Sequence, residues 1–206
     1  MQRILILIFI SHFCFSQNFK AVKDTAALKQ RIEAMSKSVN SIESDFTQEK
    51  NLSILSEKVN SKGHFIFKKE NKLRWEYFTP YKYLIVINND KIWIKDDKKT
   101  SKFDMNSNRV FKEINDIMIS CVQGTIFKAG KFAITYFENE KFYKLELAPL
   151  QKNMKESLKK INMYFDKNVT SVSKLDMIEP NEDYTTLEFV NKKINASVAD
   201  NIFSVK

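Results

Sequence analysis

Few side chains in this sequence could do chemistry. His64 is the only histidine beyond the N-terminal apolar segment, so a Ser-His-Asp triad would have to use it. No Gly-x-Ser-x-Gly sequence is present to hold a nucleophilic serine. Cys121 is the only cysteine beyond the same segment, and its apolar neighbours are typical of a buried, inert thiol. One histidine and one cysteine do not supply the clustered ligands of a zinc site.

Carboxylates are the remaining candidates for acid-base catalysis. Asp96 and Asp97 are adjacent, and Glu179, Glu182 and Asp183 form a second group. Each group lies in a turn-like stretch, where acidic side chains are usually solvated. The chain has only three glycines, so it contains no Gly-rich phosphate-binding loop. The sequence therefore predicts no catalytic residue, no metal site and no cofactor.

Large apolar side chains are abundant instead. The chain has 17 Phe, 7 Tyr, 2 Trp and 7 Met residues. Most occupy alternate positions of predicted strands, where such side chains ordinarily form a protein core. A second interpretation is that they line a hollow for an apolar ligand, which requires a sheet that does not collapse on itself. The residues alone leave both interpretations open.

The N-terminus has the features of a secretory signal peptide. Arg3 supplies a basic start, and residues 4–15 are apolar. This run is shorter than the roughly 20 residues that span a bilayer. Ser16 provides a small residue before the expected cleavage site. We therefore expect residues 1–16 to be a signal peptide and residues 17–206 to form a single periplasmic domain.

The formal net charge of +9 does not come from one basic patch. Lysine pairs are dispersed along the chain, and acidic residues lie among them. This pattern is typical of solvated strand edges that resist pairing with other sheets. A weak attraction to anionic lipid headgroups is the alternative. A secreted protein of this kind is not expected to bind nucleic acid.

The spacing of apolar residues predicts mostly strands. Apolar residues at intervals of three and four predict one amphipathic helix over residues 19–40. From Ser44 the period becomes two, and Asn- and Asp-rich turns separate the alternating runs, which predicts a meander of about ten antiparallel strands. A second helix is expected between residues 110 and 123, and a helical turn within residues 153–158.

Several stretches, in order, resemble one known family. They are residues 45–48 (DFTQ), 61–67 (SKGHFIF), 73–80 (LRWEYFTP) and 88–93 (NNDKIW). A Thr-rich strand over residues 184–190, followed by Asn191, Asn195 and Phe203, extends the match. This ordered set is similar to the outer-membrane lipoprotein carrier proteins of the LolA family.

The resemblance implies a mainly β fold with some helix: an unclosed antiparallel β-barrel, or half-barrel, covered by a helical lid. It implies a monomeric carrier, not an enzyme, that shelters lipoprotein acyl chains in an apolar cavity. Such a carrier takes its cargo from an inner-membrane release complex, crosses the periplasm and delivers it to an outer-membrane acceptor, with transient membrane contact. Carriage of another amphiphile, such as a glycolipid or a lipid-linked precursor, is the alternative, and a secreted interaction module with a solid core is a third.

The resemblance and the strand alternation together give a set of candidate lipid-binding residues. Trp75 and Tyr77 match the aromatic strand of the family motif, and Lys69 lies where many members have an arginine, which would bond bidentately where lysine cannot. The complete predicted set is Phe65, Phe67, Lys69, Leu73, Trp75, Tyr77, Ile85, Trp93, Met105, Ile117, Met118, Phe132, Ile134, Met163, Leu187 and Phe189.

Overall fold

The computed structural model describes residues 18–55, 57–105, 119–120, 125–127, 130–168 and 171–205. Its helical elements are α1 (Thr25–Lys37), α3 (Lys152–Lys155) and the 3-10 helix η2 (Asp200–Phe203). Its strands are β1 (Lys20–Ala21), β2 (Ser41–Asn51), β3 (Val59–Lys68), β4 (Lys72–Thr79), β5 (Tyr83–Asn88), β6 (Lys91–Lys95), β7 (Thr100–Asp104), β8 (Phe132–Glu138), β9 (Phe142–Pro149), β10 (Lys160–Asp166), β11 (Val172–Ile178) and β12 (Tyr184–Ile194).

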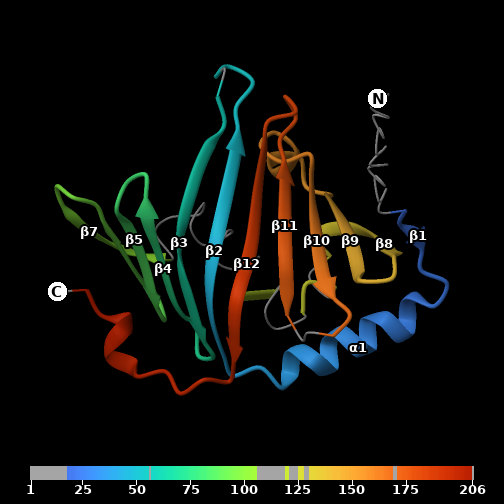
Figure 1. Ribbon diagram of the computed structural model, residues 1–206, viewed down its shortest axis with the longest axis horizontal. Coiled ribbons are helices and arrows are strands. Elements are labelled where there is room, and N and C mark those ends of the chain that lie inside the picture. Colours follow the sequence, from blue (N-terminus) through green and yellow to red (C-terminus); the bar gives the residue numbers. More distant parts are fainter. Residues whose placement is uncertain are drawn as a thin grey trace, which may run out of the picture.

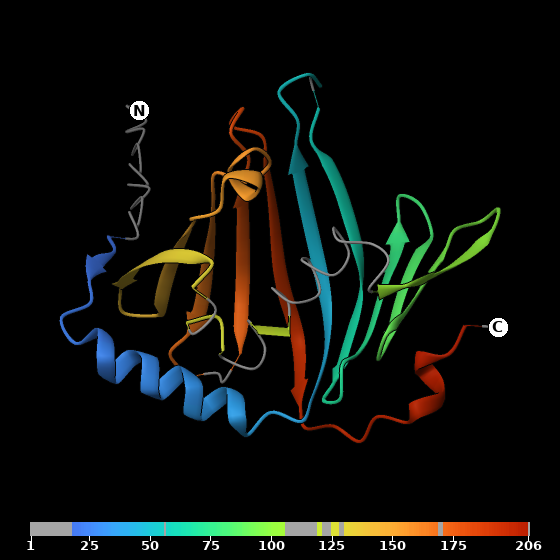
Figure 2. The ribbon, with the colours of Figure 1, turned by 180° about the vertical axis from the view of Figure 1, so that it is seen from behind.

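All of these strands belong to one antiparallel sheet that does not close. The strand order is β1-β8-β9-β10-β11-β12-β2-β3-β4-β5-β6-β7, and every pair is antiparallel. The sheet is strongly curved, and its two edges curl toward the viewer in Figure 2. The mainly β, unclosed antiparallel fold predicted from the sequence is therefore confirmed.

The connectivity differs from the simple meander predicted from the sequence. Strands β2 to β7 follow one another as neighbours, but β8 lies on the far side of the sheet. Strands β8 to β12 then return toward the middle, where β12 pairs with β2 from Tyr184–Asn51 to Ile194–Ile42 (Figure 1). Two meanders thus join at the centre of the sheet. The sequence did not predict this connectivity, because turn signals locate hairpins but do not reveal which distant strands pair.

Helix α1 is shorter than the predicted helix. It begins at Thr25, because the Asp24 side chain accepts a hydrogen bond from the Ala27 backbone N–H at 2.9 Å and caps the first turn. The residues before it are extended, and Lys20–Ala21 pair with β8. The predicted helical turn near residue 153 is confirmed as α3.

The helix predicted over residues 110–123 falls mostly outside the described residues, where only its Ile119 and Ser120 are included, and both are helical. Cys121 also lies outside them. Among the described residues, no helix has the length and hydrophobicity needed to cross a bilayer.

The C-terminal segment packs on the convex face of the sheet. Arg74 donates a hydrogen bond to the Ile202 carbonyl at 3.2 Å, and Asn88 donates one to the Phe203 carbonyl at 3.3 Å. Asp200 accepts hydrogen bonds from Lys68 and Lys72 at 2.6 and 3.1 Å. Arg74 alternates with the inward-facing Leu73 and Trp75, so η2 lies on the side opposite the concave face.

Candidate apolar binding face

The concave face of the sheet carries two groups of buried apolar side chains. The first, here called the helix-side cluster, contains Leu28, Ile32, Ile126, Phe132, Tyr136, Leu145, Leu147, Met154, Ile161, Met163 and Phe165. The second, here called the aromatic cluster, contains Val39, Ile42, Phe46, Phe65, Phe67, Leu73, Trp75, Ile87, Ile92, Met105 and Leu187. Leu175 and Met177 of β11 pack against both clusters, so the two form one continuous, buried apolar layer on the concave side of the sheet.

Strand alternation produces this surface. Leu73, Trp75 and Tyr77 of β4 point inward, and Lys72, Arg74 and Glu76 alternate with them. The same alternation places Ile161, Met163 and Phe165 of β10 on the concave side. The period-two pattern in the sequence therefore predicted the inward residues correctly on these strands.

Trp75 lies at the centre of a group of aromatic rings. Its ring is surrounded by Phe46, Phe65 and Phe189, with centroids at 4.8, 5.2 and 6.1 Å. Phe46 also meets Tyr77 edge to face at 5.1 Å. Such tilted and edge-to-face pairs add about 0.5–1.5 kcal/mol each beyond the area that they bury. The rings therefore hold one another in fixed orientations.

Gly63 makes room for this aromatic packing. A Cβ atom at Gly63 would lie 2.0 Å from the Glu76 carbonyl oxygen and 2.5 Å from the Phe46 ring. Only a residue without a side chain lets the Phe46 ring lie against β3 at this point. The glycine of the 61–67 motif is thus required because the Phe46 ring and the Glu76 carbonyl lie so close to its Cα atom.

The aromatic cluster and its border contain two polar groups, the Tyr77 hydroxyl and the Trp75 indole N–H. The Tyr77 hydroxyl donates a hydrogen bond to Gln48 Oε1 at 3.0 Å, and burial raises the pKa of this phenol. The indole N–H of Trp75 lies near that hydroxyl but makes no hydrogen bond of good geometry within the described part of the chain. A buried donor without a partner costs about 1–3 kcal/mol. The indole N–H and the phenol are therefore the polar groups that this part of the apolar layer has to accommodate.

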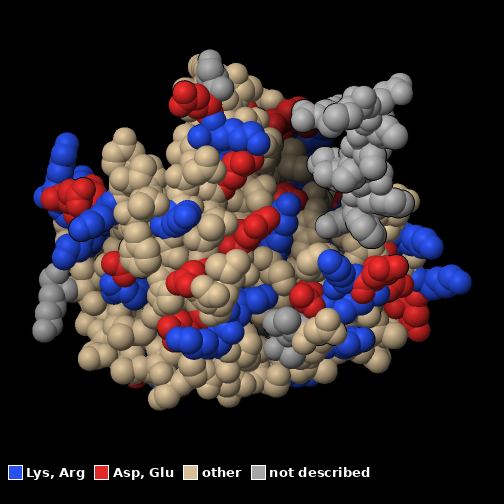
Figure 3. Space-filling view, in the orientation of Figure 1, with Lys and Arg blue, Asp and Glu red and all other residues tan. Residues whose placement is uncertain are grey.

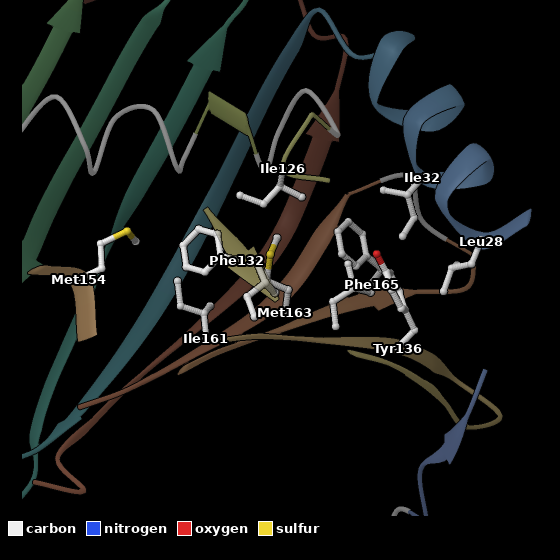
Figure 4. Close-up of a cluster of buried hydrophobic side chains, with 11 residues drawn as sticks. Leu28, Ile32, Ile126, Phe132, Tyr136, Met154, Ile161, Met163 and Phe165 are labelled. Carbon is white, nitrogen blue, oxygen red and sulfur yellow. The ribbon is translucent and has the colours of Figure 1, made fainter. Parts of the chain in front are cut away.

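The helix-side cluster is assembled from several segments. Figure 4 shows Leu28 and Ile32 of α1 directed toward Phe165 and Tyr136 of the strands. Met154 of α3 and Ile126 approach from other sides. Met163, Leu145 and Leu147 are fully buried beneath them. Helix α1 contributes no residue to the aromatic cluster, so a helical lid over the whole concave face stays a prediction.

Lys69 connects the sheet to the end of α1. Its Nζ donates a hydrogen bond to the carbonyl of Lys37, the last residue of α1, at 2.7 Å. Its backbone N–H donates to the Asn40 carbonyl at 2.8 Å. A cation at a helix C-terminus also interacts favourably with the helix dipole. Lys69 is therefore a contact that anchors the helix, and it does not line the apolar surface.

The other predicted site residues divide into three groups. Those on the concave apolar face are Phe65, Phe67, Leu73, Trp75, Tyr77, Ile85, Met105, Phe132, Ile134, Met163, Leu187 and Phe189. Ile117 and Met118 lie outside the described residues. Trp93 was assigned to the wrong face: Ile92 and Ile94 beside it point inward, so its ring points outward, where the Lys102 ammonium lies 5.2 Å from its centroid.

Sequence reasoning missed several members of the surface. Phe46 is almost completely buried at its centre, yet it was noted only as part of a motif. Leu145, Leu147 and Ile161 belong to the helix-side cluster but are not in the predicted set of site residues. Leu28 and Ile32 belong to a helix, and a helical period does not reveal which part of a sheet the helix covers. Strand alternation was the signal that could have found Phe46.

His64 lies on the convex face in a polar group. Its Nδ1 is 2.8 Å from Asp45 Oδ1, and its Nε2 is 3.5 Å from Glu43 Oε1. Asn191 donates a hydrogen bond to Asp45 Oδ2 at 2.9 Å. The bonds from Asn191 and His64 lower the pKa of Asp45. Within the described ranges, no three His, Cys, Asp or Glu side chains group to hold a metal ion. The arrangement ties β12, β2 and β3 together.

A groove of about 1090 Å³, lined by both charged and apolar side chains, lies between the start of α1 and the β8–β9 turn. Arg31 bridges it with hydrogen bonds of 3.3 Å to the Tyr143 hydroxyl and to the Lys167 carbonyl. Lys167 in turn pairs with Glu138 at 2.8 Å. The groove adjoins the helix-side cluster, because Leu28 lines both, while the charged groups at its rim bond to one another.

The charges on the convex face are mixed. Figure 3 shows Lys and Arg side chains interspersed with Asp and Glu over this side of the molecule. Cross-strand pairs such as Lys193–Glu43 at 3.2 Å, and the Lys144–Glu146 pair at 2.7 Å along β9, account for part of this pattern. The visible face thus has no extended single-sign patch of the kind that binds nucleic acid.

Comparison with known proteins gives the same fold. An uncharacterised conserved protein from Thermus thermophilus superposes with a TM-score of 0.55 at 9% identity, covering 87% of this chain and 93% of that one. MucB in the Pseudomonas aeruginosa MucA/MucB complex gives 0.50 at 12% identity, covering 86% of this chain and 59% of that one.

No curated protein matches the sequence. The family model described as outer membrane lipoprotein carrier protein LolA matches residues 37–206. This match includes β2 to β12, and therefore all the strands that form the aromatic cluster and nearly all that form the helix-side cluster. By this match the chain belongs to the LolA family.

Proposed function

We propose that this protein is a periplasmic carrier that binds the acyl chains of lipoproteins on its concave apolar face and ferries them from the inner to the outer membrane. Residues 1–16 are its signal peptide. An inner-membrane release complex supplies the cargo, and an outer-membrane acceptor receives it. The protein acts without catalysis.

The observation that carries the proposal is the continuous apolar layer that the concave side of an unclosed sheet holds. Keeping acyl chains out of water is worth about 0.8 kcal/mol per CH₂ group, so two or three chains carry roughly 20–40 kcal/mol. Hydrogen bonds at about 1 kcal/mol each cannot offset such a penalty. A surface built from two adjoining clusters, with Leu175 and Met177 between them, is apolar over its whole width.

Release requires that the surface also adapt. Methionine side chains are flexible and tolerate ligands of varying shape. Met163, Met154 and Met105 lie in the two clusters, and Met177 packs against both. Loose, non-directional contacts suit a carrier that must give up its cargo.

A different amphiphile, such as a glycolipid or a lipid-linked precursor, would use the same surface. Mass spectrometry of lipids that co-purify with the protein from the native periplasm distinguishes lipoprotein cargo from another amphiphile. Triacylated or diacylated lipoproteins support the proposal, and a glycolipid alone replaces it with the alternative.

The two tryptophans provide a matched pair of variants. Trp75→Glu puts a charge into the aromatic cluster, whereas Trp93→Glu puts the same charge on the opposite face of a nearby strand. We expect Trp75→Glu to abolish extraction of lipoprotein from inner-membrane vesicles while Trp93→Glu retains it. Circular dichroism checks that both variants keep the sheet. Equal extraction of lipoprotein by the two tryptophan variants would contradict the proposal.

His64→Ala is a separate test. We expect it to keep the extraction activity, and a loss of that activity would reopen an enzymatic function.

A further inference from the structure

The most exposed large apolar side chains of the described residues gather at one end of the sheet. In the β2–β3 turn, Ile54 is 88% exposed and Leu55 is 47% exposed. In the β4–β5 turn, Tyr81 is 78% exposed, and Phe78 just before it is 51% exposed. Antiparallel strands alternate in direction, so both turns lie at the same end, the upper end in Figure 1.

The β2–β3 hairpin projects beyond its neighbour β4. Strand β4 ends at Thr79, which pairs with Lys62, whereas β3 begins three residues earlier at Val59, paired with Lys50. At about 3.3 Å per residue, this adds roughly 10 Å before the turn itself. Figures 1 and 2 show the hairpin as the highest point of the molecule. Ile54 and Leu55 are therefore carried to the outermost end of the sheet.

The base of this hairpin is held in place. The Ser53 N–H donates to Asp183 Oδ1 at 2.5 Å, and the Leu55 N–H donates to the Leu52 carbonyl at 2.9 Å. Lys58 pairs with Glu49 at 2.8 Å. The apolar side chains are thus presented on a turn that hydrogen bonds support, and they do not fold back onto the sheet.

We propose that the tips of the β2–β3 and β4–β5 hairpins dock on the surface of an anionic phospholipid bilayer, with Ile54 and Leu55 inserted among the lipids and Tyr81 at the headgroup level. Two apolar tips at one end of a rigid sheet define an edge that meets a flat surface. Tyrosine has an apolar ring and a polar hydroxyl, which suits the membrane interface.

Charge supports the same partner. The chain carries a net charge of +9, or +8 without Arg3 of the proposed signal peptide, which attracts it to anionic lipids, and Lys82 is exposed between Tyr81 and Tyr83. In the nearby acidic β11–β12 turn, Glu182 pairs with Lys159, and Asp183 accepts the hydrogen bond of Ser53. The inference goes beyond carriage, because it assigns the surface that meets the membrane and needs no cargo to be tested.

The first experiment measures co-sedimentation of the full chain with phosphatidylethanolamine–phosphatidylglycerol vesicles. Relative to the unaltered chain, the double variant Ile54→Asp/Leu55→Asp is expected to lose vesicle partitioning by roughly tenfold or more, since each side chain leaves the lipid and each charge is repelled. Leu55→Asp alone is compared with Val190→Asp, which adds the same single charge, because Val190 is a similarly exposed apolar residue in β12, away from the turns. An equal loss in both variants, or no loss in either, overturns the proposal.

The second experiment locates the contact with the membrane. Its signal comes from residue 54, so it does not report on membrane binding by residues 1–16. Ile54→Trp places a reporter at the tip, and its fluorescence should shift to shorter wavelength with vesicles and be quenched by brominated acyl chains. Val190→Trp should show neither change. If the Ile54→Trp emission stays that of a solvated indole while the protein binds vesicles, the hairpin is not the contact. Binding of a fluorescent fatty acid by Ile54→Asp/Leu55→Asp in solution, expected to be retained, reports separately on the carrier function.

Discussion

The two halves of the concave face are built differently, although both are apolar and both lie on one sheet. In the aromatic cluster, rings from β2, β3, β4 and β12 touch one another around Trp75. In the helix-side cluster, a helix and two further segments outside the sheet add aliphatic and methionine side chains to those of the strands. One half is therefore a wall of rings that pack on one another, whereas the other is assembled from side chains of several separate segments of the chain.

The largest effect should come from removing the helix side chains of the helix-side cluster. Each of Leu28 and Ile32 is buried, so Leu28→Ala/Ile32→Ala should cost about 4 kcal/mol or more in the free energy of unfolding. Hydrogen exchange should accelerate in β8, β9 and β10, while β3, β4 and β5 stay protected. Gln30→Ala, on the exposed side of α1, is the control. Uniform loss of protection across the sheet would show that the two halves do not behave separately.

The next largest effect tests the fixed rings of the aromatic cluster. Gly63→Ala forces a Cβ atom to within 2.5 Å of the Phe46 ring and 2.0 Å of a backbone oxygen, so we expect a loss of about 3 kcal/mol or more in urea unfolding. Gly130→Ala has open space around it but a φ of +60°, and should cost about 1 kcal/mol. Similar losses in the free energy of unfolding of the two variants would mean that the Phe46 ring shifts at little cost to make room for the added methyl group.

A smaller effect is expected where α1 is anchored to the sheet. Lys69→Met removes the hydrogen bond to the Lys37 carbonyl and should cost about 1 kcal/mol, because the bond is exposed to solvent. If α1 must move for cargo to reach the helix-side cluster, the same variant should take up a fluorescent fatty acid faster. Lys62→Met, on an exposed part of β3, should change neither quantity. Slower uptake by Lys69→Met would argue against movement of α1.

The smallest effect concerns the C-terminal segment on the convex side. Hydrogen bonds from Lys68 and Lys72 lower the pKa of Asp200. A carboxyl group whose pKa is lowered by folding stabilises the folded state above its ordinary pKa of 3.8, and this contribution is lost as the pH falls through the lower pKa of the folded state. Acid unfolding curves of the wild type and Asp200→Asn should therefore differ at neutral pH and converge in strong acid. Curves separated by the same amount at every pH would contradict this.

Much of this architecture follows from local patterns. The alternation of Leu73, Trp75 and Tyr77, or of Ile161, Met163 and Phe165, depends only on the geometry of a strand, so the inward residues were predictable. The start of α1 was misplaced because Phe19 and Val22 continue the helical spacing. The cap formed by Asp24 overrides that spacing.

The remaining features depend on contacts between distant parts of the chain. Trp93 was assigned inward because its strand lies in the family motif, but its face is fixed by the inward direction of Ile92 and Ile94. Nothing in the neighbourhood of Lys69 indicates that it bonds to the end of α1. The pairing of β12 with β2 likewise depends on residues more than 130 positions apart.

That central pairing has a consequence for how the molecule is made. Strands β2 to β7 can pair through local hairpins, but the other edge of β2 stays unpaired until β12, more than 130 positions further along the chain, joins it. Closing so large a loop slows folding, and an open strand edge invites association with other chains in the meantime. A folding molecule in which only β2 to β7 have paired therefore exposes an unpaired edge of β2. Loss of β12 would divide the sheet into β2 to β7 and β1 with β8 to β11, joined only through the connecting chain.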